Sequence, residues 1–147
     1  MNKGELNHKF FRTKQMHQKI TFDKLMKYGI APGQPNVLRF LMCNNGCIQN
    51  QLAVDCNLEP ATITSMLNRM EKAHLIERKS DAADKRVSTV WITQTGMEMC
   101  NQVNEIFKEI EEICYGGFSE DEKEVFFGLL DRMKNNIKSE LDSTKEV

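Results

Sequence analysis

Long apolar runs are missing from this chain of 147 residues, of which 28% are charged. No segment reaches the roughly 18 to 20 consecutive apolar residues that a membrane-spanning helix requires. The opening residues, Met1 to Glu5, lead into charged sequence and not into the apolar core of a signal peptide. We therefore expect no association with a membrane and a cytoplasmic location.

The chain also lacks paired cysteines. Its five cysteines are odd in number and none stands in a Cys-x-x-Cys arrangement, so neither a disulfide framework nor a four-thiolate zinc site follows from them. Because free cysteine usually fills buried apolar positions, we expect most of the five to be buried. A reactive thiol needs an accessible thiolate near positive charge. Arg39 is the one such neighbour that the sequence suggests for Cys43 and Cys47, which leaves a cysteine-based redox switch as an alternative.

Catalytic and metal-binding motifs are absent as well. The sequence has no phosphate-cradling glycine loop, no His-Glu-x-x-His and no nucleophile motif. His8 and His17 lie nine residues apart, without a neighbouring carboxylate to complete a metal pair. We expect a protein that is not an enzyme and that uses no cofactor or metal. A non-catalytic protein-interaction module is the alternative from another functional class.

Net charge is small, but the charges are unevenly distributed. The chain carries a formal charge of −1, whereas residues 1–30 contain seven basic and two acidic residues and residues 98–147 contain six basic and thirteen acidic ones. Between these regions, Arg78, Lys79, Lys85 and Arg86 form a short basic run. Because phosphate binding depends on local more than on total charge, an acidic body does not exclude a nucleic-acid contact.

What the sequence does contain is a series of segments with apolar residues at helical spacing. Pro60 suits the first position of a helix, where an N–H has no intrahelical partner. Ser119 and Glu122 have the spacing of a capping box, and Thr93 or Thr95 could cap the preceding helix. The expected helices cover residues 2–27, 35–44, 49–55 and 60–72, a fifth stretch from about Thr93 to Gly116, and a sixth that begins at Ser119.

A β-hairpin is expected between the fourth and fifth helices. Residues 75–79 and 87–93 each contain β-branched or large apolar residues, and the intervening residues are polar with a basic tip. Two helices followed by such a hairpin are what a winged helix-turn-helix needs to contact DNA. The expected fold is mainly α with a small β-hairpin wing. We expect a winged helix-turn-helix lobe over residues 35–96 and a helical region over residues 1–34 and 97–147.

The helix over residues 60–72 has two different faces. Ile63, Leu67 and Met70 form an apolar stripe, and the opposite face is small and polar. Taken alone, that face would be ordinary solvated surface. Because a short supporting helix precedes it and a basic-tipped hairpin follows it, we interpret it as a DNA-contacting face. Its candidate contact residues are Thr62, Thr64, Ser65, Asn68 and Arg69.

The first, fifth and sixth helices carry more apolar surface than a thin winged lobe could cover. In the sixth helix, for example, Val125, Leu129 and Ile137 recur on one stripe. A two-fold homodimer is the commonest way to bury such surface, and we expect residues 1–34 and 97–147 to form the dimerisation region. A self-contained helical bundle without a partner is the alternative.

Several short segments together resemble the signature run of the MarR family of bacterial transcriptional regulators. They are Leu52-Ala53, Thr62-Ile63-Thr64, Arg69-Met70-Glu71-Lys72, Leu75-Ile76-Glu77-Arg78, Asp84-Lys85-Arg86 and Ile92-Thr93-Gln94-Thr95-Gly96. The resemblance implies a homodimer that binds pseudo-palindromic double-stranded operator DNA, usually as a repressor, and that releases it when a small-molecule effector binds.

The resemblance also assigns roles to individual residues. It puts the helix over residues 60–72 in the major groove and Lys85 and Arg86 of the wing beside the adjacent backbone and minor groove. Asp84 is expected to orient Arg86, because a carboxylate would be repelled by phosphate. The family's effectors bind between the helical body and the lobe, and the candidate effector residues are His8, His17, Arg39 and Cys43.

Two positions depart from the family pattern. His74 stands where the family commonly has Gly, just after the recognition helix, so we expect a helix end there with a side chain that tolerates a positive φ. Ile48 stands where a capping Ser or Thr is usual, so we expect the third helix to begin without a side-chain cap.

Overall fold

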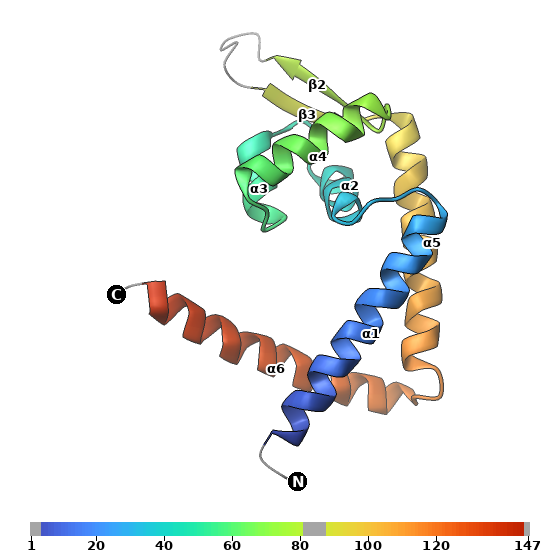
Figure 1. Ribbon diagram of the computed structural model, residues 1–147, viewed down its shortest axis with the longest axis vertical. Helices are drawn as coiled ribbons and strands as arrows, with labels where there is room; N and C mark the ends of the chain where they lie inside the picture. Colours follow the sequence, from blue (N-terminus) through green and yellow to red (C-terminus); the bar gives the residue numbers. More distant parts are fainter. Residues whose placement is uncertain (1–3, 81–87, 146–147) are drawn as a thin grey trace. The chain divides into compact units, whose positions relative to one another are not determined.

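The computed structural model of the chain describes residues 4–80 and 88–145. These residues form helices and a small sheet (Figure 1). By internal contacts the chain divides into two compact units, residues 1–110 and 111–147. In chain order the elements are α1 (Glu5–Lys27), α2 (Gln34–Cys43), β1 (Cys47–Ile48), α3 (Gln49–Asp55), α4 (Pro60–Lys72), β2 (Ile76–Ser80), β3 (Ser88–Ile92), α5 (Gln94–Tyr115) and α6 (Glu120–Lys145).

The sheet has three antiparallel strands in the order β1-β3-β2. In the hairpin, Arg78 pairs with Val90, and on the other side of β3 the same Val90 pairs with Cys47. The mainly helical fold with a β-hairpin is confirmed. The sequence did not predict β1, because two residues are too few to show a strand pattern.

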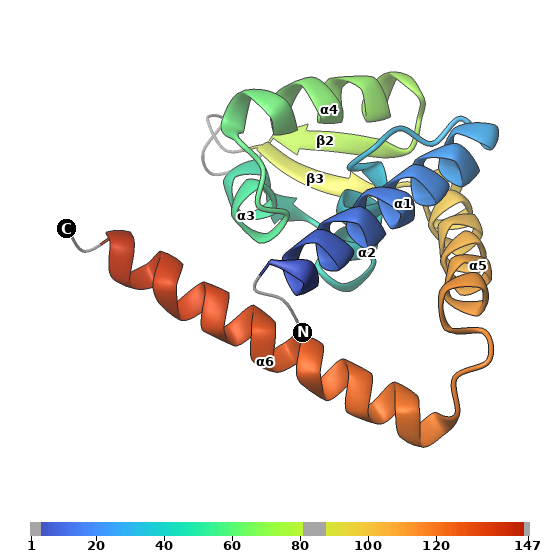
Figure 2. The ribbon, with the colours of Figure 1, turned by 60° about the horizontal axis from the view of Figure 1, so that its bottom comes forward.

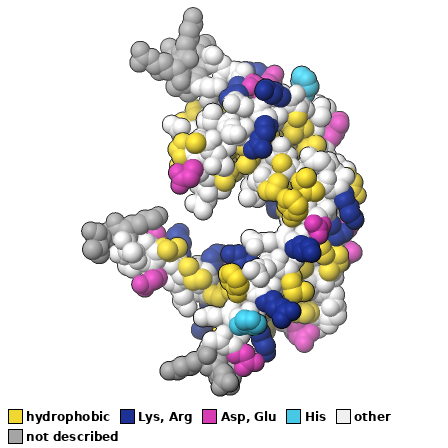
Figure 3. Space-filling view, in the orientation of Figure 1, with side chains coloured by type: hydrophobic (Ala, Val, Ile, Leu, Met, Phe, Trp, Pro, Cys, Tyr) yellow, Lys and Arg dark blue, Asp and Glu magenta, His cyan; other side chains and the backbone are white. Residues whose placement is uncertain are grey.

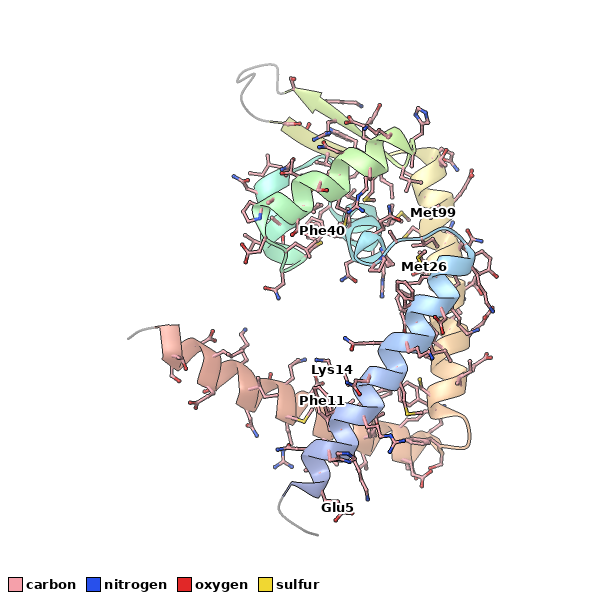
Figure 4. The ribbon with its side chains drawn as sticks, in the orientation of Figure 1. Glu5, Phe11, Lys14, Met26, Phe40 and Met99 are labelled. Carbon is pink, nitrogen blue, oxygen red and sulfur yellow. The ribbon has the colours of Figure 1, made fainter. Side chains whose placement is uncertain are left out.

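The core of the first unit lies between the sheet and the helices of the lobe. The predicted apolar stripe of α4 is confirmed, because Ile63, Leu67 and Met70 are at most 1% exposed. Phe40 of α2 and Met99 of α5, labelled in Figure 4, are partly buried and pack against this core. Figure 2 shows α4 lying along β2, so burial of its apolar stripe leaves the opposite face outside.

The start of α5 is locked to the start of the hairpin. The Thr93 hydroxyl donates to the carbonyl of His74 at 2.6 Å and accepts from the N–H of Gly96 at 3.0 Å, which confirms Thr93 as the cap. A Cβ on Gly96 would lie 2.1 Å from the carbonyl oxygen of Leu75. His74 has φ of 57°, as expected for a helix end at this position. The backbones therefore meet here with room only for glycine.

The loop before β1 is joined to β3 by equally close contacts. The side-chain oxygen of Asn45 accepts from the N–H of Ile92 at 2.9 Å, and the N–H of Gly46 donates to the carbonyl of Val90 at 2.9 Å. Gly46 has φ of 80°, and a Cβ there would lie 2.6 Å from the ring of Trp91. Trp91 is itself half-buried. Ile48 begins α3 without a side-chain cap, as expected.

The second unit contains the end of α5, a glycine turn and α6. The predicted capping box is confirmed: the Glu122 carboxylate accepts from the N–H of Ser119 at 2.8 Å, and the Ser119 hydroxyl accepts from the N–H of Glu122 at 3.2 Å. Beside this turn the rings of Tyr115, Phe118 and Phe127 meet at centroid distances of 5.4 to 6.0 Å. The aromatic contacts fix the turn locally.

Each unit leaves large apolar side chains open to solvent. Figure 3 shows such side chains on the visible face of α1 and of α6. Figure 4 labels two of them on α1, Phe11 and Met26. The exposed apolar residues of these two helices are Leu6, Phe10, Phe11, Met16, Phe22 and Met26 on α1, and Val125, Phe127, Leu129, Ile137 and Leu141 on α6. Of the helices that the structure describes, none is apolar over a length that could cross a membrane.

Candidate nucleic-acid interface

The outer face of α4 presents the candidate contact residues. Thr62, Thr64, Ser65, Asn68 and Arg69 are all exposed. A shallow groove of about 680 Å³ runs along this face and brings four of them together, with Lys72 at one end and Pro60 at the other. Thr62 is exposed on the same helix but does not line the groove.

Thr64 already uses its hydroxyl within the protein. The hydroxyl donates to the carbonyl of Pro60 at 2.8 Å and accepts from the side-chain amide of Gln49 at 2.7 Å. Because a threonine hydroxyl has a single hydrogen to donate, Thr64 has no donor left for a phosphate or a base. Gln49 is the first residue of α3, so this pair of bonds braces the supporting helix against α4.

Asn68 is held by a residue from the wing strand β2. The Nη2 atom of Arg78 donates to the side-chain oxygen of Asn68 at 2.5 Å. The same Nη2 donates to the Glu71 carboxylate at 2.6 Å, and Nε of Arg78 donates to that carboxylate at 3.0 Å. The backbone N–H of Arg78 also donates to Glu71, at 3.2 Å. Hydrogen bonding from Arg78, together with its positive charge, lowers the pKa of Glu71, although partial burial opposes this.

Arg69 and Lys72 are differently placed. Arg69 makes one long hydrogen bond, from Nε to the carbonyl of Ser65 at 3.4 Å, which does not involve its terminal nitrogens. Within residues 4–80 and 88–145, neither Arg69 nor Lys72 forms an ion pair with an acidic side chain. Both can therefore offer positive charge to an anion in the groove.

The basic run of the hairpin is partly engaged inside the protein. Arg78 binds Glu71, and Lys79 forms an ion pair with Glu77 at 2.7 Å while its ammonium lies 4.8 Å from the centre of the Trp91 ring. Arg78 and Lys79 therefore already have partners inside the protein. Asp84, Lys85 and Arg86 lie outside the described residues, and their expected roles stay predictions.

The candidate effector residues do not share one cavity. An open groove of about 670 Å³ in the first unit is lined by His17 but not by His8, Arg39 or Cys43. His8 is exposed on α1, Cys43 is exposed at the end of α2, and the Arg39 guanidinium lies 5.7 Å from the centre of the Phe107 ring, at the border of the groove. Of the four candidates, His17 alone lines this groove, and the effector role of each stays a prediction.

Sequence reasoning missed most of the groove because its walls come from distant segments. Apolar walls are supplied by α1, by the turn before α2 and by α5. An ion pair between Lys24 and Glu109, at 2.7 Å, joins α1 to α5. The Pro- and Gly-rich turn before α2 was the only feature of the local sequence that could have pointed to this groove. The residues that line the groove are His17, Gln18, Lys19, Thr21, Phe22, Leu25, Ile30, Pro32, Gly33, Pro35, Asn36 and Phe107.

The cysteines are less buried than expected. Cys47 and Cys100 are buried, Cys56 and Cys114 are partly buried, and Cys43 is exposed. Burial raises the pKa of Cys47, Cys56 and Cys100, which lowers their thiolate fraction. Among the described residues no group of three or more His, Cys, Asp or Glu side chains could hold a metal ion.

Comparison with known proteins gives a consistent result for this lobe. Residues 30–88 match the MarR family model. The chain is 39% identical over 75 residues to the transcriptional regulator HosA of Escherichia coli, and this aligned segment spans 51% of the chain and 56% of that relative. It is 24% identical over 103 residues to the HTH-type transcriptional regulator YybA of Bacillus subtilis. The chain thus spans about half the length of the first of these relatives.

Solved structures with the same architecture cover nearly the whole chain. The PcaV transcriptional regulator of Streptomyces coelicolor matches with a TM-score of 0.79 and 21% identity, over 92% of this chain and 98% of that one, which bears on the fold alone. A mutant of MepR from S. aureus, bound to an oligodeoxyribonucleotide, matches with a TM-score of 0.62 and 25% identity, over 90% of this chain and 97% of that one.

Proposed function

We propose that the chain is a transcriptional regulator of the MarR family, whose model matches residues 30–88, and that it binds double-stranded operator DNA as a homodimer and acts as a repressor. The observation that carries this proposal is the exposed polar face of α4, whose groove gathers hydroxyl, amide and guanidinium groups beside a β-hairpin. An α-helix of this kind fits the major groove of B-DNA.

The proposed contacts divide between the helix and the wing. Thr62, Ser65, Asn68 and Arg69 face base edges and phosphates in the major groove, with Thr64 bracing the helix from within. Lys85 and Arg86 contact the adjacent backbone and minor groove, where the negative potential attracts Arg, and Asp84 orients Arg86. Binding to chromosomal DNA implies a cytoplasmic location.

A homodimer is supported by the apolar side chains that α1 and α6 leave exposed. We propose that residues 1–34 and 97–147 form the dimerisation region and that residues 35–96 form the DNA-binding lobe. Two-fold symmetry then presents two copies of α4 to half-sites separated by one helical turn of DNA or a multiple of it, roughly 34 to 36 Å per turn.

The groove beside α1 is the proposed site of the effector. Phe22, Leu25 and Phe107 give it apolar walls, and His17 supplies a polar group, so a small apolar or aromatic compound fits its chemistry. Such a ligand releases DNA when it prefers the lobe spacing that does not match successive major grooves. A screen of small aromatic compounds for release from the operator, with Phe22→Ala as the variant that loses the response, tests this step.

DNA binding is tested by selecting bound sequences from a random pool of duplexes and measuring affinity over a range of salt concentrations. We expect a pseudo-palindromic site and a steep fall of affinity with salt. Arg69→Ala and Arg86→Ala should weaken binding, and Arg132→Ala on α6 is the matched control that should not. Absence of a selected sequence, or affinity that does not respond to salt, would contradict the proposal. Sedimentation equilibrium that shows only monomer at micromolar concentration would contradict the dimer.

A further inference from the structure

Arg78 links the wing strand β2 to the reading face of α4 through two side chains of that helix. Its guanidinium is held against the Glu71 carboxylate by two hydrogen bonds, at 2.6 and 3.0 Å, while Nη2 also reaches the side-chain oxygen of Asn68. Glu71 and Asn68 lie three residues apart on α4, so they are neighbours on one side of the helix. Arg78 is thus committed inside the protein, whereas Asn68 still lines the exposed groove.

The chemistry of arginine fixes the orientation of the Asn68 amide. A guanidinium group only donates hydrogen bonds, so the atom of Asn68 that faces Arg78 must be the oxygen. The amide nitrogen, with its two donors, is then the end of the side chain that Arg78 does not hold. Glu71 holds the same guanidinium in place, so the orientation of Asn68 depends on all three residues.

We propose that Arg78 is a positioning residue for DNA sequence recognition: it fixes Asn68 with the amide donors available to the groove, so that α4 selects guanine and not adenine at the base that Asn68 reads. This inference rests on the proposed binding of α4 in the major groove. An unrestrained Asn pairs with adenine through one acceptor and one donor, whereas guanine presents two acceptors, O6 and N7.

A merely structural role for Arg78 predicts a different result. The side chains of Arg78 and Glu71 are 24% and 39% exposed, and partly exposed ion pairs contribute little to stability. Loss of the pair therefore leaves the lobe folded. A fold defect would weaken binding to every DNA sequence equally, while a loss of positioning changes the preference at one base pair and leaves the others as they were.

The experiment measures the relative affinity of the full-length protein for a library of single-base variants of its selected operator. Asn68→Ala identifies the position that Asn68 reads, and there we expect wild type to prefer guanine by about tenfold, the effect of one good base contact. Arg78→Lys keeps the charge but loses the planar fork, and should reduce the guanine preference at that same position to less than about threefold. Glu71→Gln removes the charge that holds Arg78 and should reduce the same guanine preference, but by less.

Lys79→Gln is the matched control, because Lys79 is the next basic residue of β2 and pairs with Glu77 instead of α4. It should leave the preference at the Asn68 position unchanged. The double variant Asn68→Ala with Arg78→Lys should behave like Asn68→Ala alone at that position. Adenine at the position in wild type, an unchanged pattern in Asn68→Ala, or an even loss of affinity in Arg78→Lys would each overturn the proposal. Failure of wild type to select any sequence would instead refute the proposed function.

Discussion

Gly96→Ala should destabilise the protein although it places a better helix former in α5. An added Cβ would lie 2.1 Å from the Leu75 carbonyl oxygen and 2.7 Å from a side-chain carbon of Ile92. Ordinary contact begins near 3.4 Å, so α5 and the start of β2 must separate by roughly 1 Å. Strain of this kind typically costs about 1 to 3 kcal/mol, against a gain of at most about 1 kcal/mol from replacing glycine in a helix.

We therefore expect the free energy of unfolding to fall by about 1 to 2 kcal/mol. The melting temperature should fall by about 2 to 4 °C for each kcal/mol lost. Gly128→Ala in α6 is the matched control, because a Cβ there meets nothing within 4 Å. It should raise stability by about 0.5 to 1 kcal/mol. Urea unfolding of both variants at one protein concentration measures the difference. Equal or higher stability of Gly96→Ala would refute the close approach of α5 to β2.

Three further outcomes follow from the described contacts. Ser119→Ala removes half of the capping box and should cost about 1 kcal/mol in urea unfolding, while Ser139→Ala, in the interior of α6, should not. Arg78 lowers the pKa of Glu71 in the folded protein, so the ionised Glu71 stabilises the fold above the ordinary glutamate pKa, and this contribution is lost as the pH falls through the folded pKa. The difference in unfolding free energy between wild type and Glu71→Gln should therefore narrow in acid. A difference that widens in acid would contradict the pairing. With an aromatic disulfide reagent, Cys43 should react faster than Cys47 and Cys100 in the folded protein, and Cys43→Ser should remove the fastest phase.

The local features of the fold were predictable because local chemistry determines them. Apolar residues at helical spacing gave the helices, and Thr93, Ser119 and Glu122 marked helix starts through side chains that cap nearby N–H groups. The apolar stripe of α4 also implied its exposed face, which is why the candidate contact residues were found. Their roles in DNA binding stay predictions.

What the sequence did not reveal depends on contacts between distant segments. β1 is defined only by its pairing with β3, more than 40 residues later. The hydrogen bonds of Arg78 to Glu71 and Asn68 cross from β2 to α4, so the sequence did not indicate that Arg78 is bound to that helix. The groove beside α1 needs Phe107 from α5 next to residues of the turn before α2. A pattern within one segment does not predict contacts between segments that are distant in the sequence.

The order of the strands also affects how the protein behaves in concentrated solution. β3 lies between β1 and β2, so both of its edges are already paired. The outer strands are a poor template for another chain: β1 has two residues, and β2 carries the consecutive charges of Glu77, Arg78 and Lys79. Short and charged edges disfavour the intermolecular strand pairing that leads to fibrils. The lobe can therefore hold a β-sheet at the surface with little tendency to aggregate through it.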